Sequence, residues 1–174
     1  GIKEVLSKPS KREAEITLIG GSPGYGECVV IHMGDGNWAV IDCCINPFNN
    51  KCIPIEYLND IGVDIKTQLK YVLCTHWHED HIRGLSELIT QCGDCATFVF
   101  SCAEDRQKFA YEMAQEFDYT RKSIVLDELR ETIIEVNKKN IKIDRVKQDK
   151  LIFKNDSVSW YALSPSENEI TKLD

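Results

Sequence analysis

The stretch His76-Trp77-His78-Glu79-Asp80-His81 contains three of the four histidines of this 174-residue chain. A hydrophobic run ends at Cys74 just before it, and leucines at helical spacing follow it. Side chains alternate along an extended segment, so His76 and His78 are expected on the same side. Asp80 and His81 follow where the chain turns into the helix, and both can face the same space. Imidazole and carboxylate groups at a strand end are good ligands for zinc or a similar divalent ion.

The spacing within this stretch offers two clusters of ligands. His76 with His78 forms one cluster, and Asp80 with His81 forms the other, so the pattern predicts a two-metal site. The alternative is a polar surface loop without a metal. Three of four histidines beside an aspartate make chance clustering a poor explanation, although any short motif carries a risk of a false match.

Outward from the motif, hydrophobic periodicity predicts a mixed α/β chain. The strands expected from apolar runs and turn signals are 15–19, 28–33, 38–41, 70–74, 96–100, 140–154 and 157–163, the last two around a turn at Asn155-Asp156. The helices expected are 54–61, one directly after the histidine motif, 103–118 and 124–136. Residues 1–13 look like a lead-in tail, and residues 14–174 look like a single domain.

The composition limits the classes of protein that this chain can represent. The hydrophobic fraction is 43%, the charged fraction is 28%, and the net charge is −7. An acidic chain is a poor candidate for coating nucleic acid phosphates, although a bound metal would still allow a nucleotide or nucleic acid as substrate. No apolar run reaches the roughly 18 residues needed to span a bilayer. We therefore expect a cytoplasmic protein without a membrane partner.

The eight cysteines are interpreted as reduced, buried thiols, because most lie in apolar runs. Cys92 and Cys95 form a C-x-x-C pattern with Cys102 nearby, which could hold a structural zinc or act as a redox pair. Ordinary thiols are favoured there because no second pair and no nearby histidine accompany them. Cys43 and Cys44 could contact a metal or become oxidised, but small buried side chains are the favoured interpretation. His32, on an early strand, is interpreted as a structural histidine.

The pattern His-x-His-x-Asp-His resembles the signature of the metallo-β-lactamase-fold hydrolases. The early strand Trp38-Ala39-Val40-Ile41-Asp42 and the continuation Ile82-Arg83-Gly84-Leu85 also resemble that family. Two further segments are similar to its competence-related, DNA-uptake-type branch: Gly24-Tyr25-Gly26-Glu27-Cys28-Val29-Val30-Ile31 and Leu163-Ser164-Pro165. The resemblance spans about residues 14–170.

The resemblance implies an αββα sandwich that holds two metal ions, usually zinc, with manganese or iron as alternatives. It implies His76, His78, Asp80 and His81 as metal ligands, and it gives Asp42 the task of holding the metal loop. Asp80 would also act in catalysis by orienting the nucleophile or receiving its proton. The implied activity is metal-dependent hydrolysis of a phosphodiester or nucleic-acid-related substrate. The alternatives are a thioester or lactam hydrolase on the same site, and a non-catalytic component with an incomplete metal site.

One departure from the family pattern concerns the remaining ligands. The family completes its site with downstream histidines and a bridging aspartate, but no histidine follows His81 in this sequence. The chain therefore resembles the N-terminal part of the fold, with the second sheet incomplete and truncated at its C-terminus. We expect the remaining ligands outside this chain, in a missing C-terminal half or a partner chain.

Overall fold

A six-stranded mixed sheet forms the centre of the structure, a computed structural model that describes residues 7–20, 26–101 and 124–170. The strands lie in the order β1-β2-β3-β4-β5-β6, the order in which they occur in the sequence. Their bounds are β1 Ala14–Gly20, β2 Glu27–Met33, β3 Trp38–Ile41, β4 Leu69–Cys74, β5 Thr97–Ser101 and β6 Lys142–Val146.

The first three strands form an antiparallel meander, and β3 to β6 run parallel. The tight turn between β2 and β3 contains Gly34 and Gly36, both with positive φ, which glycine adopts without steric cost. In the parallel part, Ile41 pairs with Leu73, so β3 and β4 end at the same edge of the sheet. This pairing determines what the residues just after each strand can contact.

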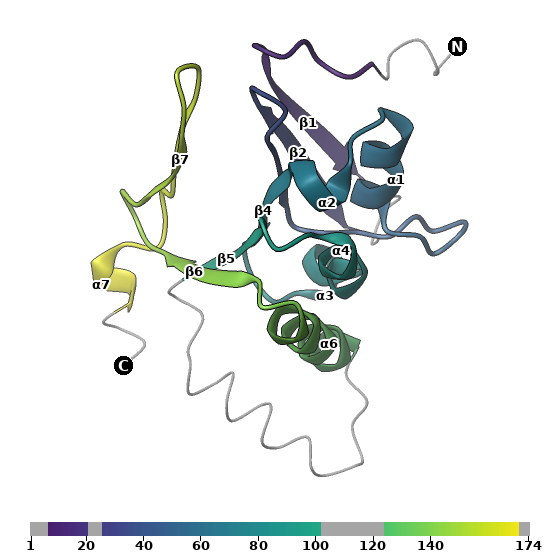
Figure 1. The fold of residues 1–174 in the computed structure, drawn as a ribbon. Helices are drawn as coiled ribbons and strands as arrows, with labels where there is room; N and C mark the ends of the chain where they lie inside the picture. Colours follow the sequence, from purple (N-terminus) through teal and green to yellow (C-terminus); the bar gives the residue numbers. More distant parts are fainter. Residues whose placement is uncertain (1–6, 21–25, 102–123, 171–174) are drawn as a thin grey trace, which may run out of the picture.

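The helices cover one face of this sheet (Figure 1). They are α1 Ile53–Asp60, α2 Ile65–Gln68, α3 Glu79–Ile82, α4 Leu85–Gln91 and α6 Ile124–Lys138. A further short helix, α7 Glu167–Ile170, lies apart from them near the end of the chain (Figure 1). The main core lies between the sheet and α1 to α4, with the fully buried Trp38, Leu58, Leu88 and Phe98 among its members. Burial of such side chains is the main favourable contribution to folding.

The opposite face carries a hairpin of β7 Leu151–Lys154 and β8 Ser159–Tyr161 (Figure 1). Tyr71 of β4 makes edge contacts with Phe153 and Trp160 of the hairpin, at ring centroid distances of 6.0 and 5.9 Å. A second, smaller apolar cluster forms there around Leu73 and Val99. The mixed α/β prediction is confirmed, and the described residues place two strands in the second sheet.

One prediction about local structure was wrong, and one short helix was not predicted. The expected strand 140–154 is divided, because β6 pairs with β5 while β7 pairs with β8, and the chain has to reverse between them. Asp149 adopts a left-handed conformation in that reversal, with φ of 67°. The helix α2 was not expected, although Asp64 accepts a hydrogen bond from the Lys66 amide as an N-cap. The expected helix 103–118 lies outside the described residues.

No helix within the described ranges is both long and apolar enough to cross a membrane.

Candidate metal centre

Asp42 stands directly after β3 in a left-handed backbone conformation, with φ of 58°. Aspartate and asparagine tolerate this conformation better than most residues. The Asp42 amide donates a hydrogen bond to the Leu73 carbonyl at 2.8 Å, and the Cys43 amide donates to the His81 carbonyl at 2.8 Å. These two bonds attach the end of β3 to β4 on one side and to α3 on the other. The unusual conformation is therefore held by the surrounding backbone.

The Asp42 carboxylate, which is largely buried, accepts three hydrogen bonds. The Thr75 amide donates to Oδ1 at 2.7 Å, and the Thr75 hydroxyl donates to Oδ2 at 2.6 Å. Nδ1 of His81 lies 2.9 Å from the same Oδ2. An ionised carboxylate only accepts hydrogen bonds, so His81 carries its proton on Nδ1. In the neutral form of this ring, the other nitrogen, Nε2, has the lone pair.

The same argument assigns the tautomer of His76. The Thr75 hydroxyl has a single proton, which it donates to Asp42, so it accepts a hydrogen bond from Nδ1 of His76 at 2.9 Å. Nε2 of His76 is then unprotonated as well. Asp42 thus fixes one imidazole directly and the other through Thr75. In both rings, Nε2 is the atom left for a metal, a common arrangement around metal-binding histidines.

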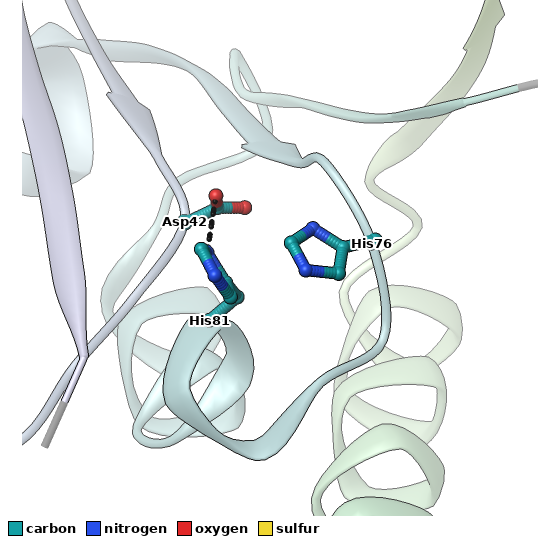
Figure 2. Close-up of side chains that lie close together, drawn as sticks. All are labelled: Asp42, His76 and His81. Atoms are coloured by element: carbon teal, nitrogen blue, oxygen red, sulfur yellow. Dashed lines mark hydrogen bonds and ion pairs between the residues drawn. The ribbon is translucent and has the colours of Figure 1, made fainter. Parts of the chain in front are cut away.

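The side chains meet in a small space between the loop after β4 and α3. Ligand atoms of Asp42, His76 and His81 all lie within 4.8 Å of one another. The ring centroids of His76 and His81 are 4.1 Å apart with the rings tilted by 47°, and Figure 2 shows them side by side, with Asp42 next to His81 and joined to it by a dashed line. Within the described part of the chain, this is the group of three close residues that could hold a metal ion.

His78 and Asp80, the other two predicted ligands, lie at the edge of this group. His78 occupies the position before α3 and places its ring 4.6 Å from that of His76. Asp80, whose side chain is 53% exposed, points Oδ2 toward Nε2 of His81 at 3.7 Å. All four residues of the motif therefore lie close together, with the His76 ring near both His78 and His81 and with Asp80 beside His81. Their service as ligands stays a prediction.

The electrostatic environment keeps His76 neutral. Burial lowers its pKa below the ordinary value, and the neighbouring His81 and His78 rings lower it further. A histidine must be unprotonated to bind a metal. The lowered pKa and the hydrogen bond from Nδ1 to Thr75 therefore both prepare Nε2 of His76 for this role.

The sequence interpretation missed Thr75, which was assigned only to a polar segment. Its position directly before the first histidine, at the end of a buried strand, was the signal available. The expected alternation is confirmed on the other side of the loop. Trp77 points away from the histidines and packs against Phe100, with ring centroids 5.9 Å apart.

The contacts of three other candidate residues, His32, Cys92 and Cys95, are those of structural side chains. His32 is buried, lies 4.7 Å from the Trp38 ring and accepts a hydrogen bond from the Gly36 amide. The thiol of Cys92 donates to the Leu88 carbonyl, whereas that of Cys95 donates to the carbonyls of residues 66 and 67. Cys102 lies outside the described residues. His32, Cys92 and Cys95 are absent from the group of close ligand residues described above.

Comparison with known proteins gives a match to one family model. Residues 21–97 match the family model of the metallo-beta-lactamase superfamily, which supports a domain of that superfamily over the segment that carries Asp42 and the histidine motif. The competence-related branch is not distinguished by this match.

Among solved structures, the chain is similar to the crystal structure of hydrolase AbOPH in the beta lactamase superfamily. The identity is 18% and the TM-score is 0.44, over 71% of this chain and 44% of that chain. This chain therefore spans less than half the length of that protein. No curated protein matches the sequence.

Proposed function

We propose that this protein is a metal-dependent hydrolase with a dinuclear, zinc-type site. The observation that carries the proposal is the pair of Nε2 atoms on His76 and His81, both left free by the hydrogen bonds that start from Asp42. Two imidazoles, a partly exposed carboxylate on Asp80 and a further histidine at position 78 make a donor set that suits zinc.

The residues fit the metals that the superfamily implies. His76 and His78 would hold one ion, and Asp80 and His81 would hold the other. Asp42 is better suited to positioning than to binding, because its carboxylate already accepts three hydrogen bonds. When bound, the metals lower the pKa of water and polarise the substrate. Each pair leaves ligand positions that other residues outside the described site have to fill.

This chain's own residues contribute orientation and proton handling. Asp42 and Thr75 hold the imidazoles in one tautomer. Asp80 has an exposed carboxylate beside His81, so it is placed to orient the attacking nucleophile or receive its proton.

A phosphodiester or nucleic-acid-related substrate is the preferred substrate class. It is supported by the resemblance of residues 24–31 and 163–165 to the DNA-uptake-type branch. A thioester or lactam on the same site is the alternative within this chemistry. The remaining ligands would come from a C-terminal half or a partner chain.

Metal analysis combined with a substrate panel tests this proposal. The purified protein, with its natural continuation or partner present, should hold about two zinc ions per molecule. His78→Ala should lose one or both, whereas Glu79→Gln, at the first residue of α3, should retain them. Hydrolysis of bis-nitrophenyl phosphate would support the phosphodiesterase function. Activity only on a thioester or a β-lactam would exclude it.

A non-catalytic interaction component is the second candidate. The sequence feature that favours it is the lack of any histidine after His81. Failure to bind metal at any tested concentration would exclude the hydrolase and support this candidate.

A further inference from the structure

Two buried cysteines lie in contact behind the metal loop. The sulfur atoms of Cys43 and Cys52 are 3.3 Å apart, and neither residue is exposed to solvent. Cys43 follows Asp42 directly, and Cys52 precedes α1. No role in the proposed metal site uses either thiol.

The backbone holds this pair in register. Ile45 and Cys52 form an antiparallel bridge, flanked by hydrogen bonds from Asn46 to the Lys51 carbonyl at 2.8 Å and from Ile53 to the Cys44 carbonyl at 3.0 Å. Because side chains alternate along a strand, Cys43 lies on the same face of this ladder as Ile45 and Cys52. The contact between the sulfurs is therefore imposed by the pairing of the two segments.

We infer that Cys43 and Cys52 form a redox-sensitive pair that closes to a disulfide. The sulfurs need to approach by about 1.2 Å to reach a disulfide bond length. The oxidant is a small-molecule disulfide: one cysteine thiolate attacks it and releases one thiol, and the second cysteine displaces the other. The balance is one new protein disulfide and two small thiols, with the hydrogens of the two cysteines ending on those thiols.

The two reduced thiols can react with an oxidant only after the segment opens. Both residues are fully buried, so a dissolved disulfide has no access to either sulfur. The tip of the connecting loop is accessible, since Phe48 is 94% exposed. Local opening of this loop, which buries little at its tip, is the expected route to reaction.

The other buried thiols near the pair have a different partner. Cys44 alternates to the opposite face, where its thiol takes part in a hydrogen bond with that of Cys28. We therefore expect the disulfide to join Cys43 to Cys52. A disulfide between Cys28 and Cys44 is the competing product.

The disulfide would form next to the residues that contact the metal loop. The Cys43 amide donates to the His81 carbonyl, and a Cβ added at Gly84 would lie 3.2 Å from Cβ of Cys52. The disulfide would tie the segment after Asp42 to the start of α1. It would thus stiffen the support of His81 without using any predicted ligand.

Peptide mapping tests this inference on the wild-type protein. The native protein is treated with oxidised glutathione, its free thiols are alkylated under denaturing conditions, and trypsin is added. Trypsin cleaves after Lys51, so residues 13–51 and 52–66 separate, and Cys52 is the single cysteine of the second peptide. A disulfide-linked pair of these two peptides is the expected product, and amide exchange at Asn46 and Ile53 should become slower.

Variants assign the partner and provide controls. Cys43→Ser should abolish the linked peptides, whereas Cys44→Ser should keep them. Cys95→Ser, which removes an exposed thiol, should leave the linkage unchanged. Full alkylation of Cys43 and Cys52 after oxidation, a link from Cys52 to Cys28 or Cys44, or stable glutathione adducts in place of the link would overturn the inference.

Discussion

Nδ1 of His81 lies 2.9 Å from Oδ2 of Asp42, although 39 residues separate them in the sequence. This contact connects the end of β3 to α3 and directs Nε2 of His81 toward Asp80. The same carboxylate oxygen receives the Thr75 hydroxyl, which in turn accepts from His76. One buried carboxylate therefore orients two imidazoles, one directly and the other through Thr75.

Replacement of Asp42 by asparagine should weaken zinc binding about 10- to 100-fold, the effect typical of residues that orient metal ligands. The amide offers a single acceptor oxygen and cannot serve both His81 and Thr75 in the same way. Isothermal titration with zinc measures the change. Glu79→Gln is the matched control, because Glu79 pairs with Arg83 and is the first residue of α3, close to the motif. Wild-type affinity in Asp42→Asn would contradict the positioning role.

Replacement of Thr75 by valine should allow the neutral His76 ring to adopt either tautomer. Without the hydroxyl, Nδ1 loses its acceptor, and the proton should distribute over both ring nitrogens. Imidazole ¹⁵N spectra of the metal-free protein report this distribution without any activity assay. Thr75→Ser, which keeps the hydroxyl, should preserve the Nδ1-protonated form. A His76 tautomer that is identical in all three proteins would show that Thr75 does not control it.

Replacement of Gly26 by alanine should destabilise the fold by about 2 kcal/mol or more. Gly26 has φ of 84°, and an added Cβ would collide with the backbone carbonyl of Asp80. Chemical denaturation measures the loss, and zinc titration should show a weaker site because the metal loop has to shift. Gly20→Ala is the control, since a Cβ there meets nothing within 4 Å. Equal stability of the two variants would contradict this contact.

The stability of the metal-free protein should decrease as the pH falls below about 6.5, in part because of His32. Burial lowers the pKa of His32 from its model-compound value of 6.5. The unfolded chain then binds a proton at a higher pH than the folded chain, so stability rises with pH between the two pKa values. The contribution is fully present above 6.5 and is lost toward the lowered pKa.

Urea denaturation at several pH values measures this dependence, and His32→Gln should show a shallower slope in the same window. Nearby charges from Lys8, Glu13, Glu15 and Asp35 also act on His32, so the salt concentration is held constant. An unchanged slope would assign the pH dependence to other groups, such as the histidines of the metal loop.

Most of the elements could be predicted from the sequence, because their signals are local. Apolar runs predicted strands at 28–33 and 38–41, where β2 and β3 lie, and the helix expected at 54–61 corresponds to α1. The division of the 140–154 segment could not be predicted, since both halves have strand character. Only the choice of partner, β5 for one half and β8 for the other, separates them.

The sequence by itself placed four candidate ligands in one short motif, and the pairing of His76 with His78 and of Asp80 with His81 stays a prediction. Tertiary structure alone decided what supports them. Parallel pairing of Ile41 with Leu73 brings the ends of β3 and β4 to one edge, so Asp42 and Thr75 meet across 33 residues. The contact of Cys43 with Cys52 likewise depends on which segments pair. Local sequence patterns do not indicate which segments pair, because the pairing depends on how the strands align in the sheet.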